Sequence, residues 1–130
     1  MAAKVKVMLV DDQRSITDVL QHIIESIGAE VIAIARDGEE AIKLYKETSP
    51  HIVLMDINMP KMDGIEALKE IVRINPKACV IMLTSLNSMD VVNECLEIGA
   101  INFLLKNNTA DVLEQEIRSS WKEYLQAARV

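Results

Sequence analysis

The chain has few cysteines, a deficit of positive charge and no long apolar run. Cys79 and Cys95 form neither a metal-ligand spacing nor a disulfide framework, so both are predicted to be small buried side chains. Fourteen basic against twenty acidic residues give a net charge of −6, which argues against a nucleic-acid-binding surface. There is no apolar run of about 18 residues, and the N-terminus lacks the apolar stretch of a signal peptide. We therefore expect a cytoplasmic protein without membrane insertion.

What is present is enough for one globular domain. The chain has 130 residues, half of them apolar, which is too short for two ordinary domains and long enough for one full core. No linker, internal repeat or low-complexity tract divides it. We expect a single domain over residues 1–130 with its core at about 4–126.

Short apolar segments alternate with helical patterns along the whole chain. Segments 5–10, 31–35, 51–55, 78–83 and 101–105 have the length and β-branched content of buried strands. Apolar residues at helical spacing follow each of them, in 16–27, 41–45, 65–72, 90–98 and from 109 into the mid-120s. Strict alternation predicts an α/β fold with a doubly wound parallel sheet and right-handed crossovers. The order of the strands cannot be read from periodicity.

Chemically active side chains follow four of these predicted strands. They are the pair Asp11-Asp12, then Asp56, Thr84 and Lys106. In a doubly wound sheet the carboxyl ends of the strands meet at one edge, where ligands bind. Two carboxylates about 4 Å apart repel by roughly 4 kcal/mol at an effective dielectric near 20. Three together therefore need a bound cation or a retained proton, and the set suits a divalent cation and a phosphoryl group.

Each of these residues also has an ordinary explanation when it is taken alone. One acid of the pair could cap the next helix while the other is solvated, and Asp56 could be a solvated strand end. Lys106 could be a surface lysine, and Thr84 an ordinary β-branched residue at a strand end.

The remaining candidates have weaker support. His22 and His51 lack companion ligands at metal spacing, so both are predicted to be structural. Met55, Met59 and Met62 are expected to fill gaps near the site. Trp121, Tyr124 and Leu125 are expected to face the core, although the two aromatic residues could anchor a partner.

Taken together, the motifs resemble the receiver domains of two-component response regulators over nearly the whole chain. The resemblance rests on Asp11-Asp12, on the run 53–64 (Val-Leu-Met-Asp-Ile-Asn-Met-Pro-Lys-Met-Asp-Gly), on Thr84-Ser85, and on Gly99-Ala100 leading to Phe103-Leu-Leu-Lys106. It implies a flavodoxin-like (βα)5 domain with strand order 2-1-3-4-5, similar to the chemotaxis regulators.

The resemblance also implies a reaction. Asp56 would accept a phosphoryl group from a phosphohistidine of a sensor histidine kinase or phosphotransfer protein, as an exposed carboxylate that is already ionised. Mg²⁺, or Mn²⁺ in its place, would be held by Asp11, Asp12, Asp56 and the backbone carbonyl of Asn58. Asp12 would bind the metal directly, and Asp11 mainly through water.

The same resemblance implies a switch that a partner protein reads. Lys106 would contact the phosphoryl oxygens, and Thr84 would offer its hydroxyl to them. Movement of Thr84 would let Phe103 turn inward and change the surface formed by the fourth helix, fifth strand and fifth helix. Positions 58 and 86, here Asn58 and Leu86, are those that tune the lifetime of the phosphorylated form in this family.

One departure and three alternatives remain. Receivers usually carry proline after the site lysine in a cis peptide, whereas Asn107 follows Lys106 here, which predicts a trans peptide and a differently shaped loop.

The chain could stand alone or be cut from a longer regulator with a DNA-binding or enzymatic output. A magnesium-dependent aspartyl-phosphate hydrolase is a rival, but its second acid is replaced by Asn58. A docking module that works without phosphate is weakened by the complete acidic set.

Overall fold

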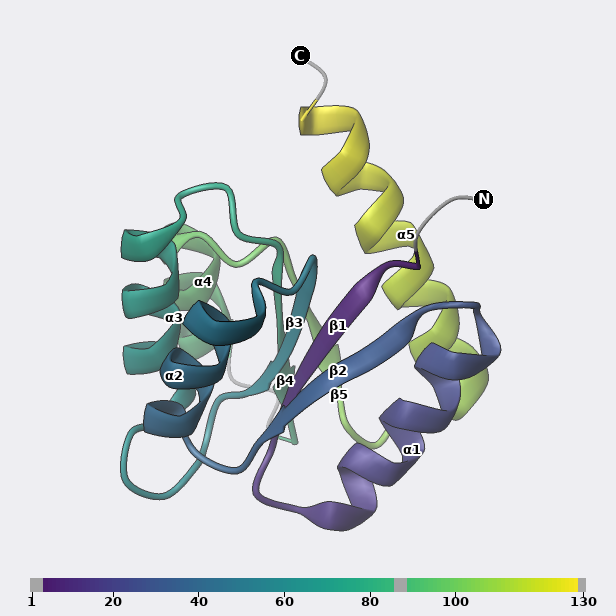
Figure 1. Ribbon diagram of the computed structural model, residues 1–130, viewed down its shortest axis with the longest axis horizontal. Coiled ribbons are helices and arrows are strands. Elements are labelled where there is room, and N and C mark those ends of the chain that lie inside the picture. The colour runs from purple at the N-terminus through teal and green to yellow at the C-terminus, as the bar shows by residue number, and fades with distance from the viewer. Residues whose placement is uncertain (1–3, 86–88, 129–130) are drawn as a thin grey trace.

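The computed structural model describes residues 4–85 and 89–128, which form three layers around one parallel sheet (Figure 1). The strand order is β2-β1-β3-β4-β5, as the family resemblance implied. The strands are β1 (Lys6–Val10), β2 (Glu30–Ala35), β3 (Ile52–Asp56), β4 (Val80–Thr84) and β5 (Asn102–Leu105). The helices are α1 (Arg14–Ser26), α2 (Gly38–Thr48), α3 (Gly64–Ile74), α4 (Met89–Ile98) and α5 (Ala110–Ala128).

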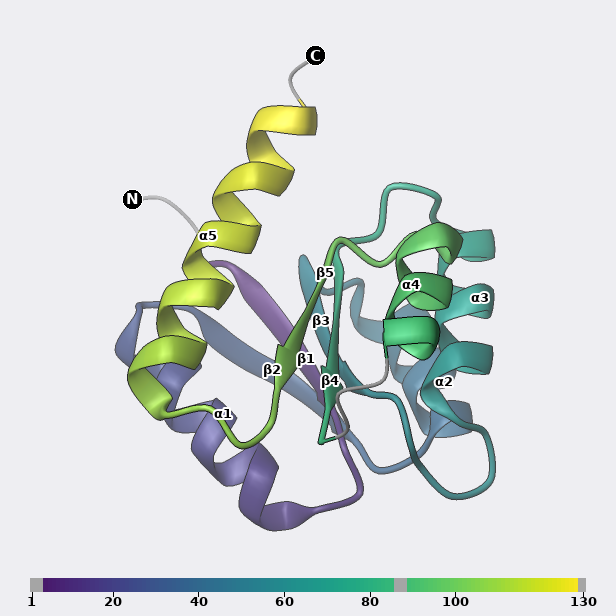
Figure 2. The same ribbon diagram turned by 180° about the vertical axis from the view of Figure 1, so that it is seen from behind.

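Successive side chains along each strand point to opposite faces of the sheet, and this divides the core into two halves. On β1, Met8 and Val10 pack beneath α2, α3 and α4, whereas Val7 and Leu9 pack beneath α1 and α5. Figures 1 and 2 show the same two layers of helices from opposite sides. The doubly wound α/β fold predicted from the alternation of apolar segments is therefore confirmed.

Local chemistry places the helix ends close to the predicted positions. Asp37 accepts a hydrogen bond from the backbone N–H of Glu40 at 2.9 Å, and Asp63 accepts one from that of Glu66 at 3.0 Å. Both aspartates satisfy N–H groups that have no partner within the helix. Gly28, two residues after the last residue of α1, has φ +87°, a conformation that favours glycine.

Some predicted positions are wrong. Leu125 was expected to face the core, but 39% of it is exposed; Val19, within the apolar pattern of residues 16–27, is 47% exposed. Val19 lies beside the buried stripe of α1. Leu125 lies near the end of α5, a helix that extends past the sheet (Figure 2). Cys79 and Cys95 are buried and unpaired, as predicted. Among the described residues no helix is long and apolar enough to cross a membrane.

Candidate functional site

The acidic residues meet at one edge of the sheet because β1 and β3 are neighbours. Val10 pairs with Met55, so both strands end at the same level and place Asp11 beside Asp56. Carboxylate oxygens of Asp11, Asp12 and Asp56 all lie within 4.8 Å of one another. The structure thus brings together the three acids that the sequence placed at strand ends.

Burial rules out the ordinary explanations for two of the three acids. Asp11 is fully buried and only 4% of Asp56 is exposed, whereas Asp12 faces solvent. The expectation that Asp56 is an exposed carboxylate is therefore wrong. Neither acid of the pair caps α1, because the N-cap residue is Gln13 and no side chain caps it. The Asp11 carboxylate instead accepts a hydrogen bond from the Gln13 backbone N–H at 2.9 Å, which fixes its orientation.

Lys106 reaches into the acidic cluster and is not a surface lysine. Its Nζ lies 2.7 Å from Oδ2 of Asp11 and 3.0 Å from Oδ2 of Asp56, and 9% of its side chain is exposed. The ammonium also donates a hydrogen bond to Oε1 of Gln13 at 3.3 Å. The described residues contain no cis peptide, so Lys106 reaches the site from a trans peptide before Asn107.

The charges of these groups alter one another's pKa. Burial raises the pKa of the Asp56 carboxyl above its usual value; Lys106 opposes this shift and Asp11 adds to it. Burial alone would lower the pKa of the Lys106 ammonium, but its ion pairs with Asp11 and Asp56 outweigh burial and raise it. Lys106 therefore remains a cation across the physiological range, whereas ionised Asp56 is held at an energetic cost.

The cluster fits a divalent cation. With all three acids ionised, three negative charges and one Lys106 ammonium leave a formal charge of −2. Asp11 Oδ2 is buried and accepts no hydrogen bond of normal geometry from the described residues, its contact with Lys106 being an ion pair. Magnesium prefers hard oxygen ligands and usually retains several waters, which the exposed position of Asp12 allows.

The loop after β3 is tightly built beneath Asp56. The Asn58 backbone N–H donates to Oδ1 of Asp56 at 3.3 Å, and the Gly64 N–H donates to the Ile57 carbonyl at 2.7 Å. A Cβ at position 64 would lie 2.1 Å from the Asp56 carbonyl oxygen. Glycine is therefore required there, which explains Asp-Gly at the start of α3. The Asn58 carbonyl remains a predicted ligand.

The two predicted switch residues lie on the next strands. Thr84 ends β4 and is buried, and its carbonyl accepts from the Lys106 N–H at 2.9 Å. Phe103 pairs with Met82 in the sheet and is half-buried against the α2–α4 half of the core. Leu86 lies outside the described residues. Thr84 and Lys106 thus share the edge that carries the acids, and Phe103 lies further back on β5.

Two residues near the site were missed by sequence reasoning. Gln13 contacts Lys106 as described above. Arg36 Nη1 donates to the Asp11 carbonyl at 3.2 Å and to the Thr17 hydroxyl at 3.0 Å, so it ties the loop between β1 and α1 to β2. No sequence signal identifies Arg36, because nothing in the periodicity places β2 beside β1.

The other candidates have structural positions. His51 Nδ1 accepts a hydrogen bond from the Lys6 backbone N–H at 2.8 Å, and its ring tilts against Trp121. Trp121 stacks on Tyr124, whose hydroxyl donates to the Lys77 carbonyl at 2.7 Å. His22 is exposed on α1 and lies outside the acidic cluster.

Comparisons with known proteins agree with this geometry. The family model for the response regulator receiver domain matches residues 7–118. The chemotaxis protein CheY of Bacillus subtilis is 41% identical over 110 residues, which cover 84% of this chain and 92% of that protein. The transcriptional regulatory protein YesN of the same organism is 36% identical over 122 residues, covering 92% of this chain but 32% of that protein. A CheX–CheY–BeF3–Mg complex from Borrelia burgdorferi contains a chain of similar structure, with a TM-score of 0.86 and 37% identity over 89% of this chain and 88% of that chain. This chain therefore belongs to the response regulator receiver family of two-component signal transduction.

Proposed function

We propose that this domain is a phosphorylation-controlled switch in which Asp56 accepts a phosphoryl group from a phosphohistidine. The donor would be a sensor histidine kinase or a phosphotransfer protein. The observation that supports this most is the buried Asp56 carboxylate, held among two further acids and one lysine ammonium. A buried carboxylate in such a cluster is costly for stability alone, which is typical of a functional site.

The chemistry follows from the residues present. An oxygen of ionised Asp56 forms a bond to phosphorus while the bond from phosphorus to the donor imidazole nitrogen breaks, so no proton need be removed from the nucleophile. Asp12, Asp56 and the Asn58 carbonyl would hold Mg²⁺ directly, with Asp11 acting mainly through water; Mn²⁺ has the same preference for oxygen ligands. The metal supplies charge neutralisation of the transferring group. Lys106, released from Asp56, would pair with the phosphoryl oxygens, and the Thr84 hydroxyl would donate to them.

Exposed apolar side chains mark two surfaces that suit protein partners of the switch. On α4, Met89 and Leu96 are exposed beside β5, which carries Phe103. This supports the face formed by α4, β5 and α5 as the surface that a downstream target reads.

Exposed Val19 lines a pocket of about 170 Å³ together with Lys106. A donor protein that delivers its phosphohistidine to Asp56 could dock there.

The domain organisation is part of the same proposal. We take residues 1–130 as one receiver domain with its core at about 4–126. Its relatives include both short chemotaxis proteins and longer transcriptional regulators, so the output is either a bound target protein or a further domain. The cytoplasm remains the predicted compartment, and direct nucleic-acid binding is not expected of this acidic domain.

The proposed function is tested by incubating the protein with acetyl phosphate and Mg²⁺. We expect incorporation that saturates at one phosphoryl group per chain and is lost when EDTA removes the metal, measured by intact mass. Steady turnover of small phosphomonoesters would contradict the switch and favour the hydrolase. No incorporation, together with no response to beryllofluoride and Mg²⁺, would favour a docking module that works without phosphate.

Arg36 gives a prediction about metal binding. Because its guanidinium holds the Asp11 carbonyl, Arg36→Gln is expected to weaken Mg²⁺ binding about tenfold, as loss of outer-shell support commonly does. The measurement is a Mg²⁺ titration followed by the NMR shifts of the Asp11 and Asp12 amides. Arg73→Gln, at an exposed arginine paired with Glu70 on α3, is the matched control. Removing positive charge near the acids would by itself tighten binding, so unchanged or tighter binding would contradict the positioning role.

A further inference from the structure

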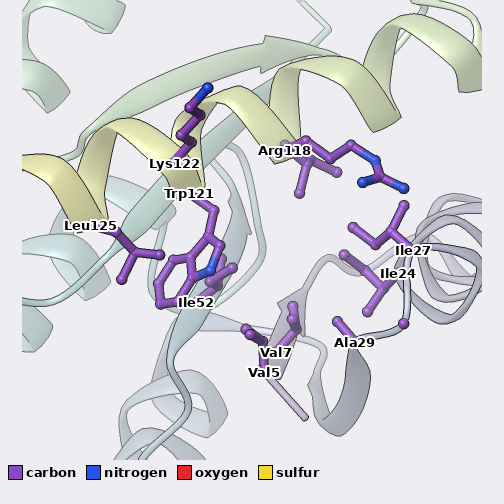
Figure 3. Close-up of a pocket in the computed structure, with 12 residues that line it drawn as sticks. Val5, Val7, Ile24, Ile27, Ala29, Ile52, Arg118, Trp121, Lys122 and Leu125 are labelled. Carbon is purple, nitrogen blue, oxygen red and sulfur yellow. The ribbon is translucent and has the colours of Figure 1, made fainter. Parts of the chain in front are cut away.

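A groove lies at the edge of the sheet opposite the acidic cluster. It has a volume of about 380 Å³ and is bounded by α5, the end of α1 and the start of β1 (Figure 3). Trp121 and Leu125 point into it from α5, and Ile24 and Ile27 form the facing wall. Val7 and Ala29 lie at its base. The site chemistry described above uses none of these residues.

An apolar stripe extends from this groove along the overhanging part of α5. This helix has 19 residues, whereas the other four have 10 to 13, and it extends past the edge where the strands begin (Figures 1 and 2). Trp121, Leu125 and Ala128 follow one another at spacings of four and three, so they share one face of the helix. Leu125 and Ala128 are exposed on it. The stripe spans about two turns, or roughly 10 Å.

Both charged residues that line this groove are basic, although the chain as a whole is acidic. Arg118 reaches across it toward Ile27, and Lys122 lies on the outer side of α5 (Figure 3). Arg118 forms an ion pair with Glu114 at 4.0 Å, and 59% of the Arg118 side chain remains exposed. Lys4 and Lys6, also exposed, flank Val5 at the start of β1, and Lys4 lines a neighbouring hollow with Glu25 and Glu30. A partner surface that complements an apolar stripe with basic flanks carries an apolar stripe with acidic flanks.

We propose that this groove docks an amphipathic helix of a partner protein that carries acidic residues beside its apolar face. A two-turn stripe beside a hollow matches the anchoring of helices that bind in grooves. A second copy of this chain fits less well, because a two-fold contact along α5 would bring Arg118 and Lys122 of both copies together. Since the groove lies away from Asp56, docking tethers the domain in both its phosphorylated and unphosphorylated states.

The test uses a synthetic peptide of about 16 residues, a length at which an isolated helix begins to be stable. Its helix carries leucine at i, i+3, i+4 and i+7 with glutamate on both flanks. Binding is followed by the emission of Trp121, the single tryptophan of the chain. We expect saturable binding to the full chain, about tenfold weaker binding (about 1.4 kcal/mol) for Leu125→Asp, and a similar loss for Arg118→Gln. Asp56→Asn should bind the peptide as the wild type does.

Leu96→Asp is the matched control, because Leu96 on α4 has the same exposed fraction as Leu125, 39%. It should leave peptide binding unchanged, and circular dichroism should show that both variants fold. Several results would overturn the proposal: no binding of the acidic peptide, equal binding of a peptide with lysine in place of each glutamate, or equal binding by Leu125→Asp. Dimerisation that Leu125→Asp abolishes would assign the groove to a second copy, and tighter binding of decanoate than of the peptide would assign it to a small amphipathic anion.

Discussion

An Asp56→Asn variant is expected to take up no phosphoryl group from acetyl phosphate under conditions that label the wild type fully. The amide has no ionised oxygen to attack phosphorus, and the neighbouring acids Asp11 and Asp12 would be occupied with the metal. Intact mass spectrometry over the same time course measures the loss. Labelling of the variant to the wild-type level would refute the assignment of Asp56.

The same variant is expected to be more stable than the wild type when Mg²⁺ is absent. The pKa of Asp56 is raised in the folded state, so between pH 3.8 and that higher pKa the folded protein binds more protons than the unfolded chain. The stability of the folded state therefore falls as pH rises from 3.8 through the pKa of Asp56 in the folded protein. The free-energy cost of keeping this buried carboxylate ionised remains at neutral pH. Removing the carboxylate charge should raise Tm by about 3 °C, the change that roughly 1 kcal/mol produces in a domain of this size.

A thermal melt with and without Mg²⁺ checks this expectation. Mg²⁺ should raise the Tm of the wild type, because it binds the folded state alone, and should raise that of Asp56→Asn less. At a pH below 3.8 the difference between the two proteins should shrink, since Asp56 is then protonated in both the folded and unfolded states. A lower Tm for the variant at neutral pH would mean that the Lys106 pairing outweighs the burial of Asp56.

Lys106→Ala is expected to have the second largest effect. Without the ammonium, Asp11 and Asp56 remain buried with no cation beside them, so the metal-free protein should lose about 3 kcal/mol of stability. Mg²⁺ binding should persist, because the negative charge of the site increases. The phosphorylation-dependent shift of the Phe103 NMR signals should be lost, since Lys106 no longer links the phosphoryl group to β5.

The matched control for Lys106→Ala is Lys61→Ala. Lys61 is also near the carboxyl edge, but 67% of its side chain is exposed and its ion pair with Asp37 spans 3.7 Å. Exposed pairs of this kind contribute little to stability. Denaturant unfolding with and without Mg²⁺ should therefore separate the two variants clearly. A full Phe103 response in Lys106→Ala would show that this lysine does not couple the site to β5.

The sequence predicted the strand-end acids well because their spacing follows from the alternation of strands and helices. Asp11 and Asp56 each follow or end an apolar segment, so a parallel sheet places both at one edge. Their adjacency depends on β1 lying beside β3, which only the family resemblance supplied. The burial of Asp56 could not be predicted, because it depends on Lys106 and on the loop that Gly64 closes over the strand.

Side chains that bridge distant segments were the least predictable. Arg36 contacts Asp11 and Thr17 only because β2 pairs with β1, and a lone arginine after a strand carries no pattern. Leu125 has helical spacing typical of a core position, but the sheet ends before the helix does. Periodicity shows which face of a helix is apolar and not how far the packing partner extends.

Mapping the phosphoryl group to a residue tests the central claim most directly. After incubation with acetyl phosphate, proteolysis at low temperature and mass spectrometry should place a single phosphoryl group on the peptide that contains Asp56, and only when Mg²⁺ was present. A phosphoryl group on a peptide containing His22 or His51 instead, or equal modification of Asp56 in EDTA, would contradict the account of a metal-dependent aspartyl acceptor.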